Sequence, residues 1–112
     1  MAKTARAFRV IDTGLRDARA NIAFDQALID ARLAGSIPNT IRFLRFPPSA
    51  LIGVHQVLPH EVRLAYCHQQ GIQVARRITG GGALFMDERQ LGWELVFDRS
   101  LFRGGRPGAA SL

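Results

Sequence analysis

The longest regular pattern of hydrophobic and polar positions lies between residues 17 and 34. Apolar side chains recur there three and four positions apart, which places one stripe along a helix: Phe24, Ala27, Leu28 and Ala31. Asp17 or Asn21 can cap the start of this helix. Gly35 suits the position after a helix, and Pro38 prevents its continuation. We therefore predict a helix over residues 17–34 whose apolar stripe faces the core.

Shorter apolar runs predict strands on either side of this helix. They cover residues 8–12, 40–46, 50–54, 73–77, 83–86 and 91–97. A turn at Thr13-Gly14 is expected to follow the first strand. A second helix is expected from Pro59 to Gly71, with an inner face of Val62, Ala65 and Tyr66. The resulting order of strands and helices predicts an α/β fold with a mixed sheet flanked by helices.

The last predicted strand carries apolar side chains on one face, at Leu91, Trp93, Leu95 and Phe97. From Arg99 onward the composition changes to glycine, proline and small residues, which is typical of a loop or linker. We therefore predict a folded part over residues 1–98 and a flexible tail or linker over residues 99–112.

Fifteen basic and nine acidic residues give the chain a formal net charge of +6. The arginines are scattered and few aromatic side chains lie among them, so nucleic-acid binding is not favoured. An anionic small molecule or an acidic protein partner explains the charge equally well. No apolar run is long enough for a membrane span, and no secretory signal is readable. The single cysteine, Cys67, is consistent with a reducing cytoplasm.

A metal site is not expected either. On the predicted second helix, His60 and Cys67 would lie two turns apart, about 10.5 Å by helix rise, which is too far for one ion. Cys67 and its neighbour His68 would point in different directions. The histidines and the cysteine therefore do not predict a metal-binding cluster.

The chemically most informative stretch is residues 76–87, in which two arginines precede three glycines, an apolar run and an aspartate. Glycines allow a ligand to approach bare backbone, so that several N–H groups can point at one anion. Arginine adds a charged planar fork that suits a carboxylate or a phosphate. The stretch predicts a cradle for a phosphate or an activated carboxyl group. The alternative is a tight β-hairpin whose arginines lie in water.

This stretch, Arg-Arg-Ile-Thr-Gly-Gly-Gly-Ala-Leu-Phe-Met-Asp, resembles the signature of the lipoate–protein ligases. Related octanoyltransferases and biotin–protein ligases carry looser versions. Residues 21–28 resemble the first helix of the family, and residues 42–56 resemble the strand pair before the signature. The resemblance covers roughly residues 8–98. It implies the biotin/lipoate ligase catalytic fold, which is akin to class II aminoacyl-tRNA synthetases.

The resemblance implies roles for individual residues. Those expected at the substrate are Arg76, Arg77, Thr79, Gly80, Gly81, Gly82, His55 and Gln56. Those expected along the nucleotide are Ala83, Phe85 and Asp87. Because neighbouring side chains on a strand leave on opposite faces, we expect one of the two arginines to face the ligand and the other to hold the loop or pair with an acid. His55 and Gln56 could instead be a strand-end pair exposed to water.

Two features depart from the family pattern. Many relatives have histidine where Met86 stands, so no role is assigned to Met86. The essential lysine of the ligases lies beyond the glycine loop, whereas no lysine follows Lys3 in this chain. The catalytic set is therefore expected to be incomplete, either because the chain is a fragment or because a second polypeptide or domain supplies the rest. Such a half domain would leave a sheet edge and an apolar face uncovered, which predicts association.

The expected activity is that of a lipoate–protein ligase. With ATP and Mg²⁺, it would adenylate lipoate or octanoate and transfer the acyl group to a lysine of a lipoyl-carrier domain in the cytoplasm. One alternative is an octanoyltransferase that uses acyl carrier protein and needs a cysteine after the signature. Cys67 precedes the signature and is not a good candidate for that nucleophile. The other alternative is a non-catalytic acyl- or partner-binding subunit.

Overall fold

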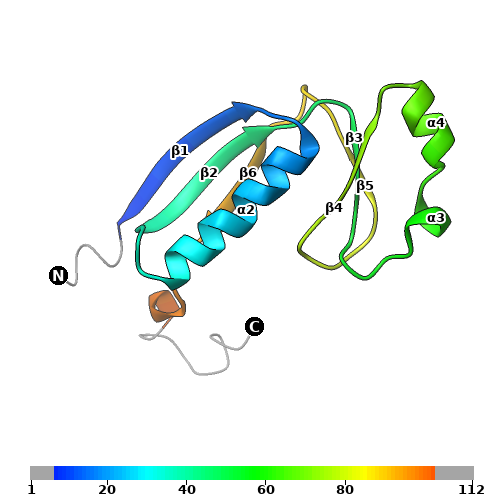
Figure 1. Ribbon diagram of the computed structural model, residues 1–112. Coiled ribbons are helices and arrows are strands. Elements are labelled where there is room, and N and C mark those ends of the chain that lie inside the picture. Colours follow the sequence, from blue (N-terminus) through cyan, green and yellow to red (C-terminus); the bar gives the residue numbers. More distant parts are fainter. Residues whose placement is uncertain (1–6, 103–112) are drawn as a thin grey trace.

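A computed structural model describes residues 7–102 of the chain as two three-stranded sheets, one long helix and several short helices (Figure 1). In chain order the elements are β1 (Phe8–Leu15), α2 (Ala18–Leu33), β2 (Asn39–Arg45), β3 (Ser49–Ile52), α3 (Leu58–Glu61), α4 (Leu64–Gln69), β4 (Gln73–Arg76), β5 (Leu84–Met86), β6 (Gly92–Val96) and the 3₁₀ helix η1 (Arg99–Phe102). The predicted order of strands and helices is confirmed. The first four residues of the predicted tail form η1, and the rest of that tail lies outside the described residues.

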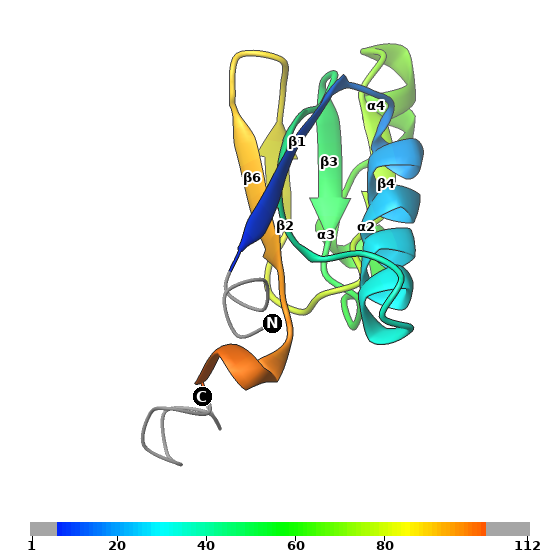
Figure 2. The ribbon, with the colours of Figure 1, turned by 90° about the vertical axis from the view of Figure 1, so that its left-hand side faces the viewer.

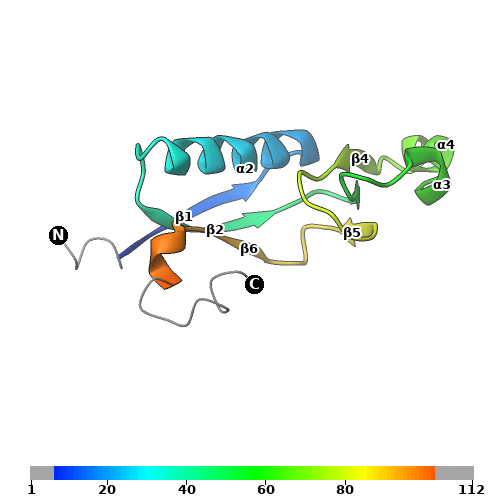
Figure 3. The ribbon, with the colours of Figure 1, turned by 90° about the horizontal axis from the view of Figure 1, so that it is seen from below.

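Both sheets combine a parallel pair with an antiparallel pair. In the first sheet β2 lies between β1, which is parallel to it, and β6, which is antiparallel. In the second sheet β3 lies between parallel β4 and antiparallel β5. A parallel pair needs a crossover connection, which α2 provides in the first sheet and α3 with α4 provide in the second. Figures 2 and 3 show α2 on one side of the strands and η1 on the other.

Local capping sets both ends of α2. The Asp17 side chain accepts a hydrogen bond from the Ala20 N–H at 2.7 Å, so Asp17, rather than Asn21, is the N-cap. At the other end Gly35 adopts a φ of 74°. The Ser36 N–H donates to the Ala31 carbonyl at 2.9 Å, which is the Schellman arrangement. The predicted helix is therefore confirmed at both ends.

The predicted inner face of α2 is only partly right. Leu28 is buried, but Ala27 is exposed, and the fully buried positions of the first turns are Ala18 and Asn21. The helix turns Asn21 and Asp25 toward the first sheet because both bind a buried arginine there. The apolar stripe alone could not reveal this, since it ignores polar side chains that have partners.

Two other predicted elements differ from the structure. Thr13 and Gly14 belong to β1, where the pairing register shifts between Asp12 and Gly14 and the Gly14 φ is 68°. The glycine therefore accommodates a bulge and not a chain reversal. The second helix is divided in two, because Val62 is extended with φ −139° and ψ 136°. This break rotates α4, so that Cys67 is buried while Tyr66 is 56% exposed.

The core lies between α2 and the two sheets. Its buried members are Ala18, Leu44, Phe46, Leu51 and Ala75, with Ile22 and Met86 packed against them. They come from α2, from β2, β3 and β4, and from the link between β2 and β3. The core therefore joins the two sheets beneath the N-terminal half of the helix.

The opposite face of the first sheet is uncovered in the described part of the chain. Strand pairing places Val10, Ile41 and Leu95 in one row across the sheet, with Trp93 beside Phe43 in the next. Val10 is 61% exposed, Trp93 64% and Leu95 44%. The apolar face predicted for the last strand therefore points away from α2, and the predicted uncovered surface exists.

We expect this face to cause association of the isolated chain. Replacing both Val10 and Leu95 by serine should lower the association constant at least about tenfold, because apolar area would no longer be removed from water. Sedimentation velocity over a range of concentrations measures this. The matched control replaces Val57 and Leu64 by serine, since these side chains are 54% and 45% exposed near α3 and α4. A wild-type chain that stays monomeric throughout would contradict the prediction.

Candidate functional site

The glycine segment lies beside the loop that follows β3. The Arg77 N–H donates to the Ile52 carbonyl at 2.7 Å, and the Val54 N–H donates to the Thr79 carbonyl at 2.9 Å. Gly53 meets the glycine segment so closely that a methyl group on it would overlap the Gly81 carbonyl oxygen. Segments 53–56 and 77–82 therefore form one braced unit where the parallel strands β3 and β4 end.

The Arg77 side chain binds backbone carbonyl groups of the glycine segment. Its Nη2 donates to the Gly80 carbonyl at 2.6 Å, and its Nη1 donates to the Gly82 carbonyl at 2.8 Å. Nη1 also donates to the Leu51 carbonyl at 3.2 Å, and Nε to Thr79 Oγ1 at 3.4 Å. The guanidinium therefore fixes the segment to β3.

Arg76 holds the other segment. Its Nη1 donates to the carbonyl oxygens of Gly53, Val54 and Gln56, at 3.1, 3.2 and 2.7 Å. The side chains of the two arginines thus bind different loops, as the alternation along a strand predicts. They also line different cavities. Arg77 lines a cavity of about 520 Å³ next to α2 and β6. Arg76 lines a cavity of about 390 Å³ next to α2 and α3.

The predicted His55–Gln56 pair is divided between surface and loop. Gln56 accepts the Gly53 N–H on its Oε1 at 2.7 Å and thereby closes the 53–56 turn. His55 is exposed. Gln56 therefore stabilises the loop. The described contacts include no hydrogen bond from the His55 side chain.

Residues 83–87 leave the glycine segment along β5. Ala83 and Phe85 are exposed, and Met86 packs against the core. Asp87 is buried and accepts hydrogen bonds from Arg89, from the N–H at 3.0 Å and from Nη2 at 2.8 Å. These bonds from the Arg89 side chain and backbone hold the pKa of Asp87 below its ordinary value. Asp87 therefore fixes the turn that leads to β6.

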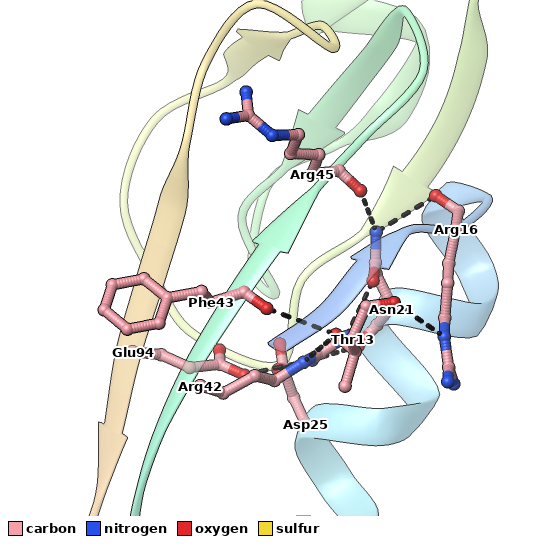
Figure 4. Close-up of polar contacts among 8 residues, drawn as sticks. All are labelled: Thr13, Arg16, Asn21, Asp25, Arg42, Phe43, Arg45 and Glu94. Carbon is pink, nitrogen blue, oxygen red and sulfur yellow. Dashed lines mark hydrogen bonds and ion pairs between the residues drawn. The ribbon is translucent and has the colours of Figure 1, made fainter. Parts of the chain in front are cut away.

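Sequence reasoning missed a buried polar cluster centred on Arg42 (Figure 4). The Arg42 side chain has no solvent exposure and donates to Asp25 at 2.7 Å and to Glu94 at 3.0 Å. It also donates to Thr13 Oγ1 at 2.8 Å, and to the Asn21 carbonyl and side-chain oxygens at 3.1 and 2.7 Å. One side chain thus ties β1, α2 and β6 to β2. Two features of the sequence could have indicated this cluster. Arg42 shares a strand face with the apolar Leu44, and the polar residues Asn21 and Asp25 lie one helical turn apart on the predicted helix.

The two carboxyl groups of this cluster share a wall of the larger cavity. Burial raises the pKa of Asp25 to about 8. The negative charge of Glu94 and its acceptance of a hydrogen bond from protonated Asp25 add to this rise, and Arg42 opposes it. A single guanidinium does not balance two ionised carboxylates in a desolvated site. Asp25 therefore keeps a proton at neutral pH.

The structure gives two further findings on residues 7–102. No group of three or more His, Cys, Asp or Glu side chains there could hold a metal ion. His60 and Cys67 lie on separate helices, α3 and α4, so the predicted separation of two turns along one helix does not apply to them. In the same range, no helix has both the length and the apolar character that crossing a membrane requires.

Comparison with known proteins decides the family. The model of the lipoyl protein ligase A/B catalytic domain matches residues 17–106. The chain belongs to this family. It is 35% identical over 85 residues to octanoyltransferase LipM of Moorella thermoacetica, covering 75% of the chain and 31% of the relative. It is 40% identical over 78 residues to lipoate-protein ligase A subunit 1 of Thermoplasma acidophilum, covering 70% of the chain and 29% of the relative.

Solved structures of the family have the same fold. A lipoate protein ligase of T. acidophilum with bound lipoic acid matches with a TM-score of 0.69 at 34% identity, over 86% of this chain and 42% of that one. A lipoate-protein ligase A bound with ATP matches with a TM-score of 0.65 at 31% identity, over 85% and 41%. A T. acidophilum structure described as a bi-partite ligase with its E2 lipoyl domain also matches, with a TM-score of 0.61 at 33% identity, over 85% and 40%. These matches confirm the predicted fold, and the chain spans about a third of the length of the curated relatives.

The contact between Gly53 and Gly81 can be tested by substitution. Gly53→Ala should lower the free energy of unfolding by about 1–3 kcal/mol, since the added methyl group forces the braced loops apart. Gly80→Ala is the control, because its methyl group would meet no atom within 4 Å. Urea denaturation of both variants measures the difference. Equal stability of the two would contradict the bracing.

The Asp25 pKa makes the stability depend on pH. Between about pH 4 and pH 8 folded Asp25 keeps a proton that the unfolded chain has released, so the free energy of unfolding falls as the pH rises through this range. Asp25→Asn should remove this contribution. The free energy of unfolding of the wild type, relative to that of the variant, should therefore be lower at pH 8 than at pH 5. Denaturation at both pH values measures it. Asp30→Asn, at an exposed position on α2, should keep the wild-type profile.

Proposed function

We propose that this chain is the acyl-binding part of a lipoate–protein ligase-like enzyme. The enzyme would adenylate lipoate or octanoate with ATP and transfer the acyl group to a lysine of a lipoyl-carrier domain. The remaining catalytic residues would come from further sequence or from a second polypeptide. The observation that carries the proposal is the placement of Arg77 and Thr79 in the wall of a cavity of about 520 Å³ that is otherwise mainly apolar. This combination suits an acyl chain with a charged head group.

The head group would lie at the braced loops. Gly80 and Gly82 are exposed, and a side chain added to either would meet no atom within 4 Å, so a carboxylate or phosphate can approach their backbone closely. Arg77 places its charge among these glycines and so favours an anion there. Arg76 would act indirectly, by holding the 53–56 loop against the glycine segment.

The residues fit a nucleotide better than they fit a protein-bound magnesium ion. Ala83 and Phe85 are exposed next to the glycine segment and offer an apolar surface to a base. Asp87 does not fit a role as a metal ligand, since both of its carboxylate oxygens accept hydrogen bonds from Arg89. We expect Mg²⁺ to be held mainly by the phosphates of ATP.

An octanoyltransferase is the second candidate, favoured by the similarity to LipM. That activity would need a nucleophilic cysteine, and Cys67 is buried on α4 and does not line the cavity of Arg77. The cysteine would therefore come from elsewhere, as the lysine would for the ligase. A non-catalytic acyl-binding subunit is the third candidate, consistent with Met86 packing in the core where many relatives have histidine.

Calorimetric titration with lipoyl-adenylate tests the proposal. It is done with the chain alone and with the polypeptide encoded by the adjoining reading frame. Arg77→Ala should weaken binding by about 1.5–3 kcal/mol, the range for a hydrogen bond to a charged group. Arg76→Ala should weaken it less, because Arg76 lines the other cavity. Thermal unfolding of each variant shows whether it is folded.

The same titration distinguishes the candidates. Absence of binding to the chain, alone or with the second polypeptide, would disprove the acyl-adenylate site. Unchanged affinity in Arg77→Ala would remove Arg77 from that site. Acyl transfer from octanoyl-acyl carrier protein without ATP would favour the transferase.

A further inference from the structure

Two carboxyl groups line a cavity whose other walls are mainly apolar. Asp25 comes from α2 and Glu94 from β6, whereas Arg77 and Thr79 come from the segment after β4. Leu44, on β2 next to the Arg42 cluster, and Leu51, whose carbonyl binds Arg77, both line this cavity, as does Phe46 between them. The floor from the carboxyl pair to Arg77 is therefore apolar. Beyond the pair the cavity continues along α2 past Ile29 to Arg32 and Leu33.

The carboxyl groups, and not the arginine behind them, are accessible from the cavity. The Arg42 side chain has no exposure, while 23% of the Asp25 side chain and 26% of the Glu94 side chain are exposed. All described bonds of Arg42 point to Thr13, Asn21 and these two carboxyl groups. What the cavity offers here is thus two neighbouring carboxyl groups on one guanidinium nitrogen, and Asp25 keeps a proton at neutral pH because burial raises its pKa to about 8.

Such a pair distinguishes between two acyl chains of the same length. An octanoyl chain ends in a methyl group, which would cover the polar pair without replacing the hydrogen bonds the pair makes to water. A lipoyl chain ends in a dithiolane ring, whose polarisable sulfur atoms are weak hydrogen-bond acceptors. An O–H group in the wall therefore favours the sulfur-containing end.

Resting on the proposed function, we propose that Asp25 and Glu94 contact the distal end of the acyl chain and make the cavity prefer lipoyl over octanoyl substrates. Arg77 and Thr79 would hold the head group at the other end. Neither carboxyl group takes part in the acyl-transfer chemistry. Their effect is on the choice of substrate.

Glu94→Met tests the inference, because it removes one carboxyl group at similar volume and leaves Arg42 paired with Asp25 at 2.7 Å. Calorimetry compares lipoyl-adenylate with octanoyl-adenylate, using the chain together with the second polypeptide if binding requires it. The ratio of lipoyl to octanoyl affinity should fall by roughly fivefold, the value of about one neutral hydrogen bond. Glu94→Gln keeps an N–H donor and should retain most of the preference.

A matched control and a pH series complete the experiment. Glu61→Met, at an exposed position on α3, should leave the ratio unchanged. The wild-type ratio should fall as the pH rises through about 8, when Asp25 loses its proton. In Glu94→Met this change should move to lower pH, because two of the three causes that raise the Asp25 pKa are removed. The other charged groups that line the cavity, Arg32 on α2 and Arg77, keep their charge throughout this range.

The outcomes separate this inference from the proposed function. If both adenylates bind and Glu94→Met weakens them equally, the acyl site stands and the carboxyl pair has only a structural role. A wild-type preference for octanoyl-adenylate would also overturn the inference. If neither adenylate binds, the proposed function fails, and the inference fails with it.

Discussion

The arrangement of this domain depends on one buried guanidinium. Removing the charge of Arg42 from water costs several kcal/mol, and this cost is offset only if every N–H group finds a partner. Arg42 finds its partners on three other elements: Thr13 on β1, Asn21 and Asp25 on α2, and Glu94 on β6. Among the described residues no buried side-chain nitrogen or oxygen lacks a hydrogen bond. The cluster therefore fixes how α2 lies across the first sheet.

This position of α2 also defines the larger cavity. The helix is attached to the first sheet through Asn21 and Asp25, while Ile22 packs on the core that joins the two sheets. The cavity runs along α2 from Ile22 to Leu33, with further lining residues from β2, β6 and the segment after β4. Electrostatics and packing are thus coupled, since the Arg42 contacts that orient the helix also place two carboxyl groups in the cavity wall. A change in the protonation of Asp25 therefore acts on both stability and the cavity surface.

The sequence predicted those parts of the fold that local chemistry determines. Asp17 and Gly35 mark the ends of α2 because each acts on backbone groups within a few residues. The break at Val62 carries no glycine or proline and was not predictable. The Arg42 cluster was missed because its partners come from positions 13 to 94, which only the folded chain brings together. The signature segment was predicted from its residue types and its family resemblance, but the bonds of Arg76 and Arg77 to loop carbonyls required the structure.

The bonds of Arg76 and Arg77 to loop carbonyls make residues 76–82 a fixed part of the structure. Adjacent parallel strands that end at the same edge of a sheet bring the loops after them together, and ligands of α/β proteins commonly bind at such an edge. Here Arg76 and Arg77 each crosslink one of the two loops, and Gly53 allows them to touch. The glycines, flexible in isolation, are held in place by side chains of the same chain. If an anion binds there, as proposed, it costs little loop entropy, so more of the interaction energy is available for recognising it.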